Sequence, residues 1–306
     1  MLPVGAVVEI SLGRRLITGI VFDSQRLATR KLTFKKGVDF ELKSIKRVIN
    51  GEPRIQAWQL RVAALIASRY AEPLGECLRT VLPAFWEKVE PAPVIQNSAP
   101  LSAQTSMLIT FEPPHTKDHA TDYLKKIKDA LAQGAHVCIL VAEEVAARYF
   151  EEAYVEFKPL FYSSSLSLKK QKEAWQTAIS AKPHLLICTR SGLFLPFKKL
   201  GLLIIDDESN EAYKSDMSPR YNAADIAPDI ARIHGAECLI SATVPRLETI
   251  YRLGLAPQAP RVKATIVDMV WEIKSANFSP LSRYVQDQLY NNAEDKKLSV
   301  LFVPHR

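Results

Sequence analysis

The sequence predicts an α/β protein in which a small β-rich module precedes a larger lobe built on a parallel sheet. From residue 107 onward, short apolar runs alternate with helical patterns, the order typical of parallel strands covered by helices. Before residue 86, the first apolar runs are short and joined by turn residues, as in antiparallel strands. Residues 87–106 are rich in proline and serine, which is typical of a linker. The expected domains are therefore residues 1–86 and 107–306.

The first part is expected to hold a β-hairpin, one further strand and two helices. Gly13 favours a tight turn between the first two strands, because glycine adopts positive φ without strain. Arg14 and Arg15 then lie at the tip of this hairpin. Short, basic strands of this kind predict a small β-barrel-like module. The expected strands are residues 7–11, 16–22 and 45–49, and the expected helices are residues 57–70 and 74–82.

The second part is expected to hold a parallel sheet sandwiched between helices. A last strand at residues 298–303 is expected to begin a second lobe. The other expected strands are residues 107–111, 136–142, 158–162, 184–189, 202–206, 236–241 and 261–269. The expected helices are residues 118–133, 143–150, 166–180, 223–234, 245–253 and 281–291.

Composition excludes several protein classes. The chain has 306 residues, enough for two domains with cores, and 47% of them are hydrophobic, as in folded proteins. No apolar run approaches the roughly 20 residues of a membrane span, and the N-terminus lacks the layout of a signal peptide. The four cysteines form no metal-binding pair or compact disulfide framework. Cys138, Cys188 and Cys238 lie in strand-like runs, which predicts buried thiols in a reducing cytoplasm. The lack of a long apolar run predicts no membrane partner.

The net charge of +7 is concentrated near the N-terminus. Residues 1–90 contain 15 lysines and arginines against 9 aspartates and glutamates, whereas the remainder contains 25 against 24. The excess is densest between Arg14 and Arg47. A basic patch on a small domain favours a polyanion as partner, and an ordinary solvated surface is the alternative.

Three acidic residues follow the apolar run at residues 202–205. Asp206, Asp207 and Glu208 stand where a parallel strand delivers its carboxyl end. Carboxylates in this place often hold Mg²⁺ beside the phosphates of a nucleotide. Solvated acids that cap the next helix have the same spacing, so the cluster alone leaves both interpretations open.

Several short motifs in order resemble one known family, the primosomal protein N′ (PriA) family of replication-restart helicases. Residues 189–197 read T-R-S-G-L-F-L-P-F, and they precede the three acids and a Ser-Ala-Thr segment at residues 241–243. This order is similar to the family's first helicase lobe. Residues 4–10, 18–21 and 70–76 look like its 3′-DNA-end-binding domain. The resemblance covers most of the chain, with gaps, and implies a RecA-like lobe of the P-loop NTPase type.

The resemblance implies DNA as the partner, in replication restart, with other primosome proteins as further partners. Gly13 corresponds to the glycine that shapes the family's DNA pocket, and Lys43 to its lysine. The family's pocket aspartate has no counterpart before Met1, which favours general binding to the DNA backbone. The twenty residues of the linker are too few for the family's winged-helix domain. The expected DNA-binding residues are Gly13, Arg14, Arg15, Lys31, Lys35, Lys36 and Lys43.

The expected phosphate-binding loop, residues 112–119, departs from what ATP needs. It contains no glycine, its two prolines lack N–H donors, and Lys117 is followed by Asp118 instead of serine or threonine. In the acidic cluster, Asp207 replaces the family's catalytic glutamate and Ser209 replaces its histidine. We therefore expect no ATP, no Mg²⁺ and no helicase turnover. Two prolines also argue against a metal site at His115 and His119.

Three functions remain open from the sequence. The first is binding of single-stranded or branched DNA at replication forks, without autonomous helicase activity. The second is an ATP-dependent 3′–5′ helicase fragment or subunit whose second lobe is elsewhere; ATP and Mg²⁺ would then meet Lys117, Asp206 and Asp207. The third is an adaptor of the replication machinery that docks proteins on the helicase-like lobe.

Overall fold

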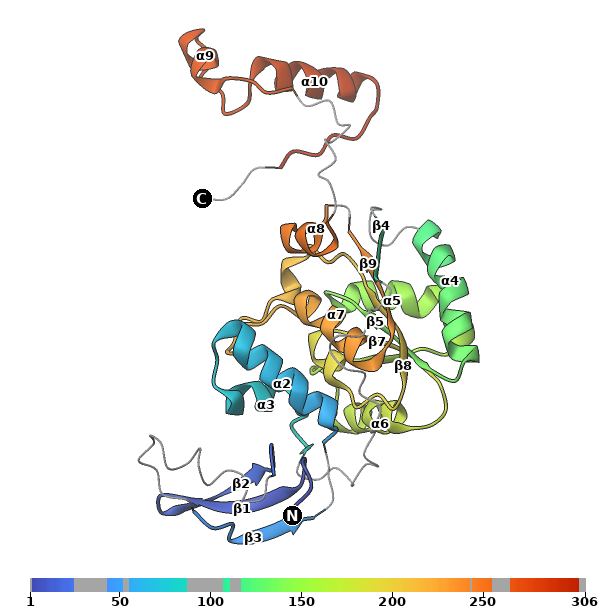
Figure 1. The fold of residues 1–306 in the computed structure, drawn as a ribbon. Coiled ribbons are helices and arrows are strands. Elements are labelled where there is room, and N and C mark those ends of the chain that lie inside the picture. Colours follow the sequence, from blue (N-terminus) through green and yellow to red (C-terminus); the bar gives the residue numbers. More distant parts are fainter. Residues whose placement is uncertain are drawn as a thin grey trace. The chain divides into compact units, whose positions relative to one another are not determined.

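The computed structural model describes residues 2–24, 43–51, 55–86, 107–110, 117–242, 244–254 and 265–302. The chain falls into two compact units, Met1–Leu253 and Gly254–Arg306 (Figure 1). The first unit contains both the N-terminal sheet and the larger lobe. This division does not test the sequence-based boundaries around the linker, which stay predictions.

Three N-terminal strands form a small antiparallel sheet in the order β2-β1-β3. The pairing of β1 (Val7–Leu12) with β2 (Arg15–Ile20) leaves Gly13 and Arg14 as a two-residue turn. Gly13 takes a φ of +61°, a left-handed conformation that costs glycine no steric strain. β3 (Arg47–Asn50) pairs with the other edge of β1. The predicted hairpin is confirmed, and its closure into a barrel-like module stays a prediction.

The two helices that follow pack against the larger lobe. α2 (Ala57–Tyr70) and α3 (Leu74–Val81) begin and end within one residue of their predicted bounds. Trp58 is buried in the same apolar cluster as the strands of the lobe. The side-chain amide of Gln59 donates to the carbonyl of Phe194 at 2.7 Å. These helices therefore share one core with the lobe.

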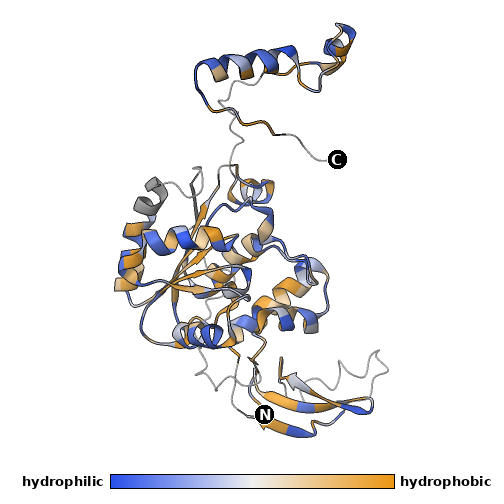
Figure 2. Ribbon diagram, turned by 180° about the vertical axis from the view of Figure 1, so that it is seen from behind, coloured by the Kyte–Doolittle hydropathy of each residue, from blue (hydrophilic) through white to orange (hydrophobic). Residues whose placement is uncertain are grey.

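Six strands of the described chain form one parallel sheet in the order β4-β9-β8-β5-β7-β6. Both of its faces are buried, and most positions along its strands are accordingly hydrophobic (Figure 2). In β5, Val137 and Ile139 join one apolar cluster, whereas Cys138 and Leu140 join the other. The bounds are β4 (Met107–Thr110), β5 (His136–Leu140), β6 (Leu160–Tyr162), β7 (Leu185–Cys188), β8 (Leu200–Ile205) and β9 (Glu237–Ser241).

Helices cover both faces of this sheet, as the alternating pattern predicts. α6 and α7 lie with α2 and α3 on one face, and α4 and α5 on the other. α7 has its predicted bounds, because Asn222 accepts from the N–H of Ala224 at its start and Gly235 ends it at a φ of +65°. The bounds are α4 (Lys117–Ala132), α5 (Glu144–Ala153), α6 (Leu168–Ile179), α7 (Ala223–His234) and α8 (Leu247–Leu253), with short 3₁₀ turns η2 (Val155–Phe157), η3 (Arg190–Phe194) and η4 (Glu211–Tyr213).

The second unit contains two helices, α9 (Met269–Lys274) and α10 (Arg283–Glu294). Buried Glu272 joins them, since its carboxylate accepts from Asn277 Nδ2 at 2.6 Å and from the N–H of Arg283 at 3.2 Å. No helix in the described parts of the chain is long and apolar enough to cross a membrane. The predicted burial of Cys138, Cys188 and Cys238 is confirmed, and all three are free thiols.

Two predicted strands in the second unit are wrong where the structure describes them. Residues 265–268 form no strand, and Met269 begins α9 because the side chain of Asp268 accepts from the N–H of Val270 at 2.9 Å. Residues 298–302 pair with no other described strand. The rest of both predictions, at residues 261–264 and 303, lies outside the described residues.

Candidate functional site

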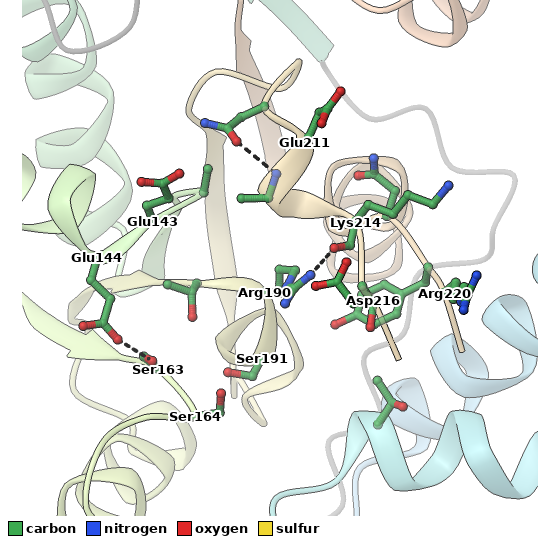
Figure 3. Close-up of a pocket in the computed structure, with 18 of the residues that line it drawn as sticks. Glu143, Glu144, Ser163, Ser164, Arg190, Ser191, Glu211, Lys214, Asp216 and Arg220 are labelled. Carbon is green, nitrogen blue, oxygen red and sulfur yellow. Dashed lines mark hydrogen bonds between the residues drawn. The ribbon is translucent and has the colours of Figure 1, made fainter. Parts of the chain in front are cut away.

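A polar cleft of about 1230 Å³ opens at the carboxyl ends of the strands of the large sheet. Its walls come from the segments that follow β5, β6, β7 and β8, so four strand ends converge on it (Figure 3). This edge of an open parallel sheet is where ligands generally bind. The labelled residues that line it are Glu143, Glu144, Ser163, Ser164, Arg190, Ser191, Glu211, Lys214, Asp216 and Arg220.

One side of the cleft carries three basic residues, Arg190, Lys214 and Arg220 (Figure 3). The guanidinium of Arg190 donates to the carbonyl of Lys214, so η3 is tied to the loop that follows β8. Asp216 lies among these cations and reduces their net charge. Arginine and lysine at an open cleft are the groups that hold phosphates, with arginine able to bind two oxygens at once.

The opposite side of the cleft is acidic, with Glu143 and Glu144 at the start of α5 (Figure 3). Glu144 Oε1 accepts from Ser165 Oγ at 2.5 Å and from Ser163 Oγ at 3.0 Å. These bonds, the one from Ser165 first, hold the pKa of Glu144 below its usual range. The carboxylate is thus ionised at neutral pH, and the two sides of the cleft differ in charge.

The predicted acidic cluster begins at the carboxyl end of β8 with Asp206, which is 1% exposed. Ser241 Oγ lies 3.5 Å from Asp206 Oδ1 and accepts from the N–H of Asp207 at 3.1 Å. Asp207 has a φ of +48°, a conformation that aspartate tolerates better than most residues. Burial, with the charge of Asp207 as a second cause, raises the pKa of Asp206 to about 7. Asp206 therefore takes up a proton at a much higher pH than an ordinary aspartate does.

Glu208, the third acid, has a structural role. It is buried, and its carboxylate accepts from Thr249 Oγ1 at 2.6 Å and from the N–H of Arg246 at 3.0 Å. Burial raises the pKa of Glu208, and these two bonds oppose that effect. The guanidinium of Arg246 is in turn paired with Asp225 at 2.9 Å. Glu208 thus fastens the end of β8 to α8 and does not join the other two acids.

A small cavity of about 130 Å³ lies beside Asp206 and Asp207. Mg²⁺ needs an octahedron of oxygens at roughly 2.0–2.1 Å, supplied by ionised carboxylates, phosphates and water. No group of three potential metal ligands exists among the described residues. Glu208 is bonded to Thr249 and Arg246, so Asp206 and Asp207 are the two members of the acidic cluster that line this cavity.

The predicted nucleotide loop falls largely outside the described residues. Residues 111–116, including His115, are not described. Lys117 begins α4, and Asp118 and His119 follow in the same helix, but only their backbone is described. The predictions for Lys117 and for the loss of phosphate binding therefore stay predictions.

The predicted DNA-binding residues that the structure describes lie at one end of the small sheet. Arg14 and Arg15 are exposed at the hairpin turn made by Gly13. β3 is antiparallel to β1, so the chain before β3, which carries exposed Lys43 and Lys46, extends toward the same turn. Lys46, which was not among the predicted residues, is held beside β1 by the hydrogen bond that its backbone N–H donates to the carbonyl of Glu9 at 2.9 Å. Lys31, Lys35 and Lys36 lie outside the described residues.

Sequence reasoning also missed the acidic side of the cleft. Ser163, Ser164 and Ser165 directly follow the strand predicted at residues 158–162, and this run of hydroxyls was the available signal. Glu144, the hydrogen-bond partner of Ser163 and Ser165, is about twenty residues away at the start of the preceding helix, so only the folded chain brings these three together.

These observations define a class of protein: an α/β lobe built on a six-stranded parallel sheet, joined to a small antiparallel sheet with basic residues at its turn. Residues 1–83 match the family of the 3'DNA-binding domain (3'BD) of PriA. The whole chain is 28% identical to replication restart protein PriA of Rickettsia prowazekii, and covers 50% of that protein. Over 60% of the chain, PriA of Bacillus subtilis is also 28% identical, with 25% of that protein covered.

The resemblance to the PriA family predicted from the motifs is therefore confirmed. The chain spans about half the length of the first of these relatives. Among solved structures, the helicase domain of Pyrococcus furiosus Hef is similar at 12% identity and a TM-score of 0.30, over 65% of this chain and 40% of that one. At this TM-score the likeness adds nothing to the fold described above.

Proposed function

We propose that this protein binds single-stranded or branched DNA in replication restart, chiefly through phosphates. The observation that carries the proposal is the match of residues 1–83 to the 3'DNA-binding domain family. The basic end of the small sheet gives this match a physical basis, because exposed cations at a turn can reach a polyanion. The relatives' name, replication restart protein, indicates the process. A cytoplasmic location and partners in the replication machinery belong to the same proposal.

The lobe offers a second contact for the same DNA. Arg190, Lys214 and Arg220 line the open cleft at the carboxyl edge of the sheet. A single strand could lie along them with its phosphates toward the cations, while Glu143 and Glu144 repel phosphates from the opposite side. The cleft thus orients a strand, and the N-terminal module contributes affinity.

We further propose that this chain does not hydrolyse ATP on its own. Burial disfavours the ionised form of Asp206, and Glu208 is bonded to Thr249, so neither acid is placed as a free carboxylate at the strand end. A magnesium–nucleotide complex needs its acids ionised and correctly placed.

The test is a salt titration of DNA affinity, by anisotropy of labelled single-stranded, forked and duplex DNA. Charge-neutral substitution of Arg14, Arg15 and Lys43 by glutamine should weaken binding and lower the slope of log affinity against log salt by about 2, at roughly 0.7 per lost single-strand phosphate contact.

A matched control replaces three other exposed lysines, Lys125, Lys182 and Lys274, by glutamine. Both triple variants lose the same charge, so a difference between them reports position. Equal slopes for the two variants would refute the placement of DNA at the hairpin. No binding of any of the three DNA forms would refute the function.

One observation favours a second candidate, an ATPase. The cavity of about 130 Å³ adjoins Asp206 and Asp207 at the strand end where helicase-like lobes place their nucleotide. Calorimetric titration with ATP and Mg²⁺ separates the two candidates. Micromolar, magnesium-dependent binding that Asp207→Asn abolishes would support the ATPase. A titration with no heat above that of dilution would refute the ATPase and leave DNA binding as the remaining function.

A further inference from the structure

A second, smaller pocket of about 220 Å³ adjoins the polar cleft. Thr80, Ser164 and Ser191 line both spaces, so the pocket opens from the wall of the cleft. Its other walls come from the end of α3, from α6 and from η3. The volume is below the roughly 300–1,000 Å³ of sites for drug-sized ligands, which limits the occupant to about one heteroaromatic ring system.

The chemistry of this pocket differs from that of the cleft. None of its lining residues is charged, and aromatic rings of Tyr162, Trp175 and Phe194 stand in its walls. An uncharged aromatic lining favours a neutral, planar ligand and disfavours phosphates and free amino acids. The cleft outside carries Arg190 and Lys214, so the two spaces match the two parts of a nucleotide, a neutral base and an anionic backbone.

Residues of the pocket wall carry polar groups whose hydrogen-bonding capacity is not used within the described chain. Trp175 is 4% exposed, and its indole N–H has no acceptor among the described residues; neither has the buried hydroxyl of Ser191. Buried donors without acceptors are rare in folded proteins and call for an explanation. The side-chain N–H₂ of Gln171 donates to the carbonyls of Leu166, at 2.7 Å, and Ser164, at 3.2 Å. The side-chain oxygen of Gln171 remains as an acceptor. Two donors and an acceptor complement the edge of a nucleobase.

The indole is also held in place. The ring of Phe85 meets that of Trp175 edge-on, with centroids 5.9 Å apart and planes at 78°. A ring fixed by its neighbours keeps the shape of the pocket wall, so it loses little entropy when a ligand enters.

We propose that this pocket receives one unstacked nucleobase from a single strand whose backbone lies in the adjoining cleft. The proposal rests on the proposed function, since the cleft must hold the strand. The pocket would bind only a strand that carries a base at this position, whereas the basic hairpin would bind any strand through its phosphates. Enzymes that act on bases extrude them into similar enclosed, aromatic pockets.

The first test compares two ligands, a 12-residue oligothymidylate and a 12-residue strand of abasic sugar phosphates, on two variants. Ala84→Leu places a larger side chain in the pocket from an exposed position, so the core is not disturbed. It should weaken binding of oligothymidylate by about 5-fold or more, the worth of one stacked base, and leave binding of the abasic strand unchanged. Ala181→Leu, at an exposed site outside the pocket, should change neither.

Equal effects of Ala84→Leu on both strands, or no effect on either, would overturn the pocket while leaving DNA binding intact. If neither strand binds the wild-type protein, the proposed function fails, and a second measurement decides the pocket by itself. In it, free thymidine and adenosine are titrated while the indole N–H resonance of Trp175, assigned with Trp175→Phe, is followed by NMR. A saturable shift that Ala84→Leu abolishes supports the pocket; an unmoved resonance refutes it.

Discussion

The two sheets of this protein are made of strands of three to six residues, yet they face very different surroundings. In the large sheet, Leu186 is fully buried, whereas Leu12 and Leu16 in the small sheet are 64% and 60% exposed. A parallel sheet covered on both faces can present chemistry only at its strand ends, and the cleft, Asp206 and Asp207 all lie there. The small antiparallel sheet keeps an open surface, and its basic residues are displayed directly. Burial thus decides where each part can meet a ligand.

The largest expected effect breaks the buried sheet. Leu186→Ala removes a fully buried side chain from β7 and should lower the free energy of unfolding by about 2–5 kcal/mol. Leu16→Ala makes the same chemical change in exposed β2 and should cost less than about 0.5 kcal/mol. Denaturant unfolding of the two variants measures the difference. Similar losses would mean that the small sheet is covered in solution.

The next largest effect is the pH dependence of stability that comes from buried Asp206 at the end of β8. Burial raises the pKa of Asp206 to about 7, well above the roughly 3.9 of an unfolded chain. The folded state thus keeps a proton that the unfolded state releases, and stability is lost as the pH rises from about 4 to about 7. Asp206→Asn removes this loss and should stabilise the protein by up to about 4 kcal/mol at pH 8 and very little at pH 4.

Thermal unfolding of Asp206→Asn across this pH range gives the measurement. Exposed Asp216→Asn serves as the matched control and should leave the pH profile of the wild-type protein unchanged. A constant difference between Asp206→Asn and the wild-type protein at all pH values would show that Asp206 does not titrate in this window.

The smallest expected effect is a loss of stability in the hairpin of the small sheet when Gly13 is replaced. Gly13→Ala forces a side chain into a φ of +61° and should destabilise the hairpin by about 1–2 kcal/mol. Gly75→Ala, in a helix with open space around its Cα, should instead gain up to about 1 kcal/mol. Hydrogen exchange of the β1 and β2 amides should quicken only for the first variant. Unchanged exchange would mean that the turn tolerates an L-residue.

The elements that the sequence predicts best are those whose ends carry local signals. The N-cap residue Asn222 and the C-terminal Gly235 mark the two ends of α7, and Gly13 marks the turn of the hairpin. The strand predicted at residues 261–269 is wrong over its described part, residues 265–269, because Asp268 caps α9 through a hydrogen bond to the N–H of Val270 that the sequence alone does not show. The apolar run at residues 298–302 resembles a strand, but a strand also needs a partner.

The site divides in the same way. The position of Asp206 and Asp207 follows from a strand that ends in acids. The separation of Glu208 from them could not be predicted, because its partners Thr249 and Arg246 lie about forty residues further along the chain. The nearness of Ser163 and Ser165 to Glu144 likewise depends on the parallel order of β5, β7 and β6.

The packing of α2 has a practical consequence. The family match stops at residue 83, yet α2 contacts α7 of the lobe. The rings of Trp58 and His234 meet edge-on with their centroids 4.7 Å apart, and Arg69 Nη2 lies 2.7 Å from Asp229 Oδ2. Cutting the chain after α3 would turn the apolar side of α2 to water and strip the cover from α7. The residues that match the family model therefore share a core with the lobe, and we expect them to unfold together with it and not as a separate domain.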